Sequence, residues 1–332
     1  MTMGMIRAVC TSQRKGTKKR AVEQALAVAG HGLEDDAHAG DWHRQVSLLA
    51  EADIATMRAK GLELEPGAFG ENLVLDTVDL GVLGIGSRLR AGEVELEISQ
   101  IGKVCHNRCA IYYQTGDCIM PRDGIFARVL HGGELRPGMA VEIVDAVPRE
   151  AIQVAVLTVS DSCSVGAATD TAGPAVAQLI EAELGAHIAW TGVEPDERDP
   201  LETRMKDLAS RGIDLVLTAG GTGCGPRDIT PEATRMVIER EVPGLAEAMR
   251  AASAEITPHA LLQRGVAGIR RSTLIVNLPG SRKAAVENLE VVLQVLDHAV
   301  RLLRGHTTHE GDERCRTDAG LPVLSGTFEV CP

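Results

Sequence analysis

Aromatic side chains are scarce in this chain, which has 2 Trp, 2 Tyr and 3 Phe among 332 residues. Proteins that bind single-stranded nucleic acids stack the bases on repeated aromatic side chains and carry a basic surface. Here 46 Asp and Glu outnumber 34 Lys and Arg, so the formal net charge is -12. We therefore expect a small anionic ligand and no nucleic acid.

Long apolar runs are also missing. Runs such as residues 154–159 and 215–219 are far shorter than the ~20 residues of a membrane-spanning helix. The N-terminal residues contain no apolar stretch of the ~7 to 15 residues that a secretory signal needs. A cytoplasmic protein without membrane contact is expected. Its eight dispersed cysteines are expected to be free thiols rather than a disulfide framework.

The pattern before residue 146 consists of short, strand-like runs separated by glycine. Helices are expected within it at residues 18–29 and 48–60, the second with Ser47 as its N-cap. Residues 1–145 are therefore predicted to form a mostly β, barrel-like domain, which a linker at residues 146–151 follows. The strands are predicted at residues 73–75, 87–91, 94–98 and 141–144.

From residue 152 onward, longer helices alternate with buried strands. This alternation predicts a three-layer α/β domain with a mainly parallel sheet over residues 152–304. Residues 305–332 lack periodicity and are predicted to form a flexible tail. The strands are predicted at residues 153–159, 187–193, 214–219 and 273–278, and the helices at residues 172–184, 200–211, 231–241, 244–255 and 282–304.

A cluster of glycines follows the predicted strand at residues 214–219. Gly220, Gly221, Gly223 and Gly225 leave backbone N–H groups unobstructed, so phosphate oxygens can approach them. The cluster has neither a P-loop lysine nor the spacing of a dinucleotide-binding motif. It predicts a phosphate site at the carboxyl end of the strand, and a tight strand-to-helix turn is the alternative.

Carboxylates accompany the glycine cluster. Mg²⁺ typically uses one or two carboxylates together with substrate phosphates, so Asp228 is a candidate metal ligand. An N-cap or Asx-turn role is the alternative for Asp228. Glu194, Asp196 and Glu197 follow another predicted strand and emerge at the same edge of the sheet, where solvated loop charge is the alternative.

These motifs and their order resemble the molybdopterin adenylyltransferases, the MogA/MoaB-like domain that is also found in gephyrin. The resemblance implies transfer of AMP from ATP to molybdopterin, release of pyrophosphate, and use of Mg²⁺. Related domains are trimeric, which implies a trimer. The matching segments are TVSD, VEPDER, DLVLTAGGTGCGPRDITPEAT, VPGLAEAMR, ITPHALLQRGVAGIR and STLIVNLPGSRKAAVENL.

The resemblance also implies roles for individual residues. It makes Asp228 and Asp196 the catalytic carboxylates, with Asp228 near the nucleotide phosphates and Mg²⁺ and Asp196 near the pterin. Gln263 stands where related sequences often carry Ser. The implied substrate- and nucleotide-binding residues are Asp161, Ser162, Gly220, Gly221, Thr222, Gly223, Pro279, Gly280 and Ser281.

A cysteine-containing segment follows the predicted strand at residues 94–98. Cys105 lies beside Lys103 and His106, and cationic neighbours lower the pKa of a thiol, so Cys105 is a candidate sulfur acceptor. A buried inert thiol and a metal site with His106 or Cys118 are the alternatives. Residues 35–49 bring His38, His43, Arg44 and Gln45 into one loop, which is either a polar pocket for an oxyanion or a hydrogen-bonded loop.

With GLEDDAHAG, RQVSLL, PGAFGENL and MPRDGIFARVLHGGELRPG, this half resembles the molybdenum cofactor sulfurase C-terminal (MOSC) domain. The resemblance implies a β-barrel-like fold that binds molybdenum cofactor or carries sulfur on a cysteine, here Cys105. The pocket then contains His38, Arg44, Lys103 and Cys109. Family descriptions also mention pyridoxal phosphate, but no lysine has a recognisable Schiff-base setting, so we do not expect that cofactor.

Two domains for one cofactor predict a bifunctional protein of molybdenum cofactor biosynthesis. Its expected ligands are molybdopterin and ATP, and other cofactor-synthesis proteins and molybdoenzymes are candidate partners. A non-catalytic carrier of the pterin is the alternative, and a nucleotide hydrolase on the same α/β fold is a third hypothesis. Release of pyrophosphate that depends on ATP distinguishes the enzyme from the carrier.

Overall fold

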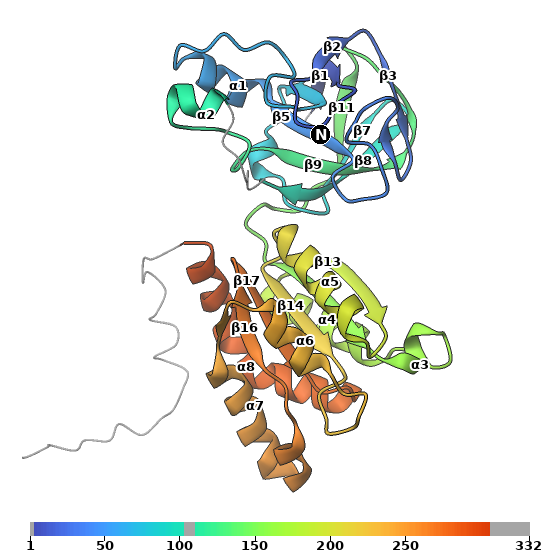
Figure 1. The fold of residues 1–332 in the computed structure, drawn as a ribbon, viewed down its shortest axis with the longest axis vertical. Helices are drawn as coiled ribbons and strands as arrows, with labels where there is room; N and C mark the ends of the chain where they lie inside the picture. The colour runs from blue at the N-terminus through green and yellow to red at the C-terminus, as the bar shows by residue number, and fades with distance from the viewer. Residues whose placement is uncertain (1–2, 103–109, 306–332) are drawn as a thin grey trace, which may run out of the picture.

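The structure is a computed structural model that describes residues 3–102 and 110–305. The flexible tail predicted from residue 305 therefore falls almost wholly outside the described residues. Figure 1 shows two parts: a β-rich domain formed by the first half of the chain, and an α/β domain below it in that view.

The N-terminal part is a closed β-barrel, as predicted. Seven of the described strands form a ring in the order β11-β7-β8-β9-β5-β6-β1, which pairing of β1 with β11 closes. Apolar side chains such as Ile6, Leu48 and Leu89 fill its interior. The strands are β1 (Met3–Thr11), β2 (Arg20–Val22), β3 (Ala25–Val28), β4 (Gly32–Leu33), β5 (Val46–Ala50), β6 (Leu73–Asp76), β7 (Arg88–Ala91), β8 (Val94–Ile101), β9 (Ile125–His131), β10 (Gly133–Leu135) and β11 (Ala140–Asp145).

Both helices predicted in this half need correction. No helix forms over residues 18–29, because β2 pairs with β1 and β3 pairs with β10 and β4. The second helix, α1 (Glu51–Arg58), begins later than predicted because Leu48, Leu49 and Ala50 pair with β6 as part of β5. Its N-cap is thus Ala50 rather than Ser47. The barrel also carries η1 (Leu80–Val82) and α2 (Ala110–Thr115).

The α/β domain contains a six-stranded mixed sheet in the order β13-β12-β14-β17-β16-β15. The first four strands of that order are parallel, and the last two run antiparallel to their neighbours. The four predicted strands are therefore confirmed, while the antiparallel edge was not predicted. The strands are β12 (Gln153–Val159), β13 (His187–Glu194), β14 (Leu215–Ala219), β15 (Arg240–Glu241), β16 (Ala267–Arg270) and β17 (Thr273–Leu278).

Helices cover both faces of this sheet and complete three layers (Figure 1). Val176, Met249 and Leu289 belong to the core on one face, and Leu201 and Ala233 to the core on the other. The helix predicted over residues 231–241 ends early because β15 takes its last residues into the sheet. The helices are α3 (Asp161–Ser164), α4 (Ala172–Leu184), α5 (Arg198–Ser210), α6 (Thr230–Val237), α7 (Pro243–Ile256), η2 (Pro258–Leu262) and α8 (Arg282–Leu303).

The barrel lies against the amino-terminal edge of this sheet. Arg304 at the end of α8 donates hydrogen bonds to the carbonyl oxygens of Glu150 and Ala151, each at 2.9 Å, and forms an ion pair with Asp214. His187, at the start of β13, packs against Gly86 of the barrel. None of the described helices is both long and apolar enough to cross a membrane.

Candidate functional site

The glycine cluster lies at the carboxyl end of β14, where the sequence placed it, and its backbone forms a tight turn. Gly220 and Gly221 have φ angles of 119° and 61°, which L side chains rarely adopt. The N–H of Gly220 donates to the carbonyl oxygen of Leu278 on β17, and the Gly221 carbonyl accepts from the N–H of Thr230 at the start of α6. The turn therefore joins two strands to a helix N-terminus.

Asp228 closes the loop that follows this turn. Its Oδ2 accepts a hydrogen bond of 2.7 Å from the N–H of Gly225, and its own N–H donates to the Gly225 carbonyl. The N-cap of α6 is Ile229, so Asp228 is not the capping residue. The carboxylate thus orders the loop locally, while its remaining lone pairs are available to a ligand.

Asp196 and Asp161 connect the ends of β13 and β12 beside the turn. Asp196 Oδ2 accepts from the N–H of Asp161, and Asp161 Oδ1 accepts from the N–H of Asp196, at 3.1 and 3.0 Å. Arg227 forms two hydrogen bonds to the Asp161 carboxylate, which lower the pKa of Asp161. Burial, and then the charges of Asp161 and Asp228, raise the pKa of Asp196. A cation between Asp196 and Asp228 would relieve that repulsion.

A cavity of about 420 Å³ opens between this loop, α7, η2 and the start of α8. Among the predicted residues, Gly221, Thr222, Gly223, Asp228, Pro279 and Gly280 line it. Asp161, Ser162, Asp196 and Gly220 lie in or next to the turn rather than in the cavity wall, and Ser281 instead caps α8 through a hydrogen bond from Ala284 N–H. Gln263, the departure from related sequences, lines the cavity, and its amide atoms have no hydrogen-bond partner among the described residues.

Arg264 donates hydrogen bonds to the loop that runs from Gly223 to Asp228. The sequence did not predict this residue. Its Nε donates to the Gly223 carbonyl at 2.6 Å, and its Nη2 donates to the Asp228 carbonyl at 2.5 Å. Its guanidinium also forms an ion pair with Glu232 of α6. Because it lies more than 30 residues from its partners, no local spacing could have identified it.

Replacing Arg264 with Met is expected to weaken binding of Mg-ATP, the ligand that the sequence predicts for this loop, about tenfold, since the change removes two charge-assisted bonds that fix the loop carbonyls. Titration calorimetry measures the affinity. Arg235→Met is the matched control, because Arg235 is an exposed α6 arginine with an ion pair of 3.5 Å to Glu241. Equal affinities in the two variants would contradict this role for Arg264.

In the barrel, the structure describes two of the predicted pocket residues. The His38 N–H donates to Asp36, whose Oδ1 also accepts from buried Lys19 at 2.6 Å. The guanidinium of Arg44 lies 4.7 Å from the centre of the Trp42 ring. Lys103, Cys105 and Cys109 lie outside the described residues.

Cys10 on β1 belongs to the apolar cluster that also contains Ile54 and Met57 of α1. It is fully buried, and burial, together with the charge of Glu71, raises its pKa to about 12. Cys10 is therefore a poor nucleophile at neutral pH, since only the thiolate attacks. Within residues 3–102 and 110–305, no three His, Cys, Asp or Glu side chains are grouped closely enough to hold a metal ion by themselves.

Comparison with known proteins finds a matching family for each half of the chain. Residues 155–298 match the family described as a probable molybdopterin binding domain, and residues 35–142 match the MOSC domain. Molybdopterin adenylyltransferase of Helicobacter pylori is 38% identical over 159 residues, which are 47% of this chain and 90% of that protein. This chain therefore belongs to the molybdopterin adenylyltransferase family. It carries a MOSC domain ahead of the family domain.

Two further relatives span the same part of this family member. The molybdenum cofactor synthesis protein cinnamon of Drosophila melanogaster is 41% identical over 187 residues, 55% of this chain. This chain covers only 30% of the length of cinnamon. The solved structure of the molybdopterin biosynthesis enzyme MoaB from Thermus thermophilus is 48% identical, with a TM-score of 0.45 over 46% of this chain and 97% of that one.

Proposed function

We propose that the α/β domain transfers AMP from Mg-ATP to molybdopterin and releases pyrophosphate. The observation that supports this most is the glycine turn at Gly220 and Gly221, which has Asp196 and Asp228 beside it and a cavity of about 420 Å³ next to it. The proposed domain is residues 152–304, joined to the barrel of residues 1–145 by a linker. The protein is proposed to act in the cytoplasm as a trimer, as related domains do.

Positioning and charge neutralisation are the proposed sources of catalysis. Backbone N–H groups of the loop hold the phosphates of ATP, and molybdopterin bonds to the α-phosphorus as the bond to pyrophosphate breaks. Arg264 fixes the loop carbonyls, so the N–H groups are aligned before the substrate binds. No covalent protein nucleophile takes part.

The donor set fits Mg²⁺. Asp196 and Asp228 supply two carboxylates, and the described residues offer no third ligand of the usual kind nearby, so substrate phosphates would complete the coordination. Bound there, Mg²⁺ would neutralise charge on the transferred phosphoryl group and on the leaving pyrophosphate. Asp161 would not compete for the ion, because Arg227 occupies its carboxylate.

The barrel is proposed to bind molybdenum cofactor and to carry sulfur on Cys105. Of the cysteines that the structure describes in the barrel, both are buried, and the pKa of Cys10 is raised. This favours a sulfur carrier in the segment that contains Cys105. The proposed pocket contains His38 and Arg44, together with Lys103 and Cys109.

Pyrophosphate release from Mg-ATP by the full chain, with and without molybdopterin, tests the enzymatic proposal. Release that requires molybdopterin is the expected result. Binding of molybdopterin without release would contradict the transferase and leave a cofactor carrier. Nucleotide turnover at the same rate with and without molybdopterin would instead identify a hydrolase.

A further inference from the structure

A group of charged side chains lies at the junction between the barrel and α5, away from the glycine loop. His43 of the barrel places its Nδ1 3.6 Å from Asp207 Oδ1 of α5, and its Nε2 is 2.9 Å from Gln100 Oε1. Arg211, which follows α5, forms an ion pair of 2.5 Å with the other oxygen of Asp207. One carboxylate of the α/β domain thus faces an imidazole of the barrel and a guanidinium of its own domain.

Arg44, the neighbour of His43, has no such partner. Its guanidinium lies 4.7 Å from the Trp42 ring centre and 5.8 Å from that of Phe126, and within the described part of the chain it forms no ion pair. Among the residues that the structure describes, its buried Nε has no hydrogen-bond acceptor, and neither has the buried Nε of Arg211. A buried donor without an acceptor is costly, and more so when it belongs to a cation. Two guanidinium donors therefore lack acceptors in one region.

The balance of charge in this region is positive. Arg204 also faces Asp207, at 3.8 Å, but its closer partner is Glu194 at 2.9 Å. Three arginines and His43 thus surround two carboxylates. Burial lowers the pKa of Arg44 and of His43, although the charge of Asp207 acts in the opposite direction on both. An anion with several oxygens would supply both the missing charge and the missing acceptors.

We infer that this junction binds a tetrahedral oxyanion between Arg44 of the barrel and Arg211 of the α/β domain. Guanidinium groups bind such anions through paired N–H···O bonds, and the Trp42 ring under Arg44 orients its fork. Molybdate, inorganic phosphate and the phosphate of a monoester share this chemistry. The inference does not rest on AMP transfer, because none of these side chains belongs to the glycine loop, but it shares Arg44 with the cofactor pocket proposed for the barrel.

Trp42 fluorescence tests the site directly, because its ring contacts Arg44. In a Trp190→Phe background, Trp42 is the remaining tryptophan of the chain. The protein is titrated separately with molybdate, inorganic phosphate and glycerol 2-phosphate at constant ionic strength. A saturable change with at least one anion is expected, and Arg211→Gln should weaken it about tenfold.

Controls separate the site from general charge effects. Arg198→Gln removes an exposed cation of the same helix, which pairs with Glu202, and should leave the affinity unchanged. Arg211→Lys keeps the positive charge. It should therefore retain part of the anion affinity that Arg211→Gln loses. The anion that binds with the highest affinity identifies the class of ligand: a metal oxyanion, free phosphate or a phosphate monoester. No saturable change with any anion, or equal affinity in Arg211→Gln and Arg198→Gln, would overturn the inference.

Discussion

Replacing Asp228 with Asn is expected to lower molybdopterin-dependent pyrophosphate release on the order of 100-fold or more, the size of effect typical for the loss of one preorganised electrostatic group. The amide oxygen of Asn can still accept the hydrogen bond from Gly225 N–H, so the loop keeps its shape while the charge is lost. Initial rates at saturating Mg-ATP measure the effect.

Asp199→Asn is the matched control for Asp228. It removes one carboxylate from an exposed position in the first turn of α5, just after the loop that carries Asp196. Its rate should equal that of the native chain. If Asp228→Asn also released pyrophosphate at the native rate, Asp228 would have only its local role of ordering the loop.

Gly220→Ala is expected to lower the free energy of unfolding of the α/β domain by about 2–4 kcal/mol. A Cβ at Gly220 would lie 2.1 Å from the carbonyl oxygen of Val159, which is backbone and cannot move aside, and the φ of 119° disfavours any side chain. Denaturant unfolding in a Trp42→Phe background reports this domain, because Trp190 lies on β13.

Gly244→Ala provides the comparison. Gly244 lies within α7, and nothing stands within 4 Å of the Cβ it would gain. Alanine there should be neutral or stabilise by up to about 1 kcal/mol. A Gly220→Ala variant as stable as Gly244→Ala would show that the turn can relax, contrary to the geometry described above.

The α/β domain could be predicted from sequence because its elements are long and strongly patterned. β12, β17 and α4 have the predicted bounds, and the glycine turn lies at the predicted strand end. The barrel was harder to predict in detail. Residues 18–29 contain four Ala together with Lys, Arg, Glu, Gln and Leu, which favour a helix locally, but pairing with β1 and β10 outweighs that preference.

The site was predictable only where its residues cluster in sequence. Asp228 and the glycines stand within one loop, so the sequence alone could bring them together as a candidate site. Arg264 reaches that loop from beyond α7, and the junction of His43 with Asp207 joins residues of different domains. Such contacts depend on tertiary packing, which no local pattern encodes.

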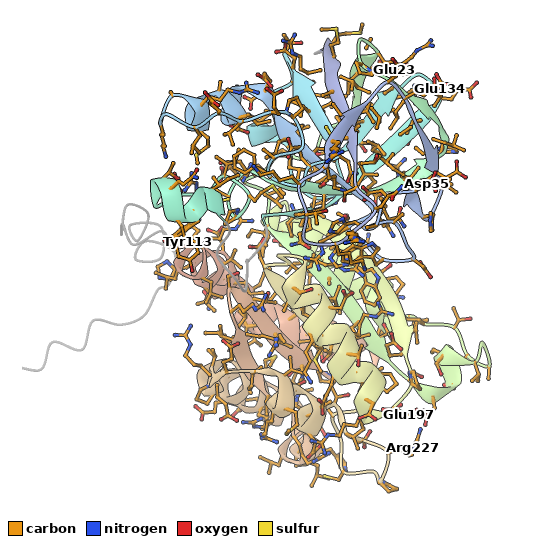
Figure 2. The ribbon with its side chains drawn as sticks, turned by 45° about the horizontal axis from the view of Figure 1, so that its top comes forward. Glu23, Asp35, Tyr113, Glu134, Glu197 and Arg227 are labelled. Atoms are coloured by element: carbon orange, nitrogen blue, oxygen red, sulfur yellow. The ribbon has the colours of Figure 1, made fainter. Side chains whose placement is uncertain are left out.

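The position of the barrel also bears on how an intermediate travels. The barrel and its Arg44 lie at the amino-terminal edge of the sheet, and the glycine turn lies at the carboxyl edge. Figure 2 shows Glu197 and Arg227, which lie near that carboxyl edge, far from the barrel. The seven residues of β12 alone separate these edges by about 23 Å. Under the proposed function, a pterin bound near Arg44 would therefore have to leave the barrel and diffuse around the sheet to reach the glycine turn. The fusion would then fix equal numbers of the two domains and raise the local concentration of the pterin at the second site, rather than pass it between adjoining sites.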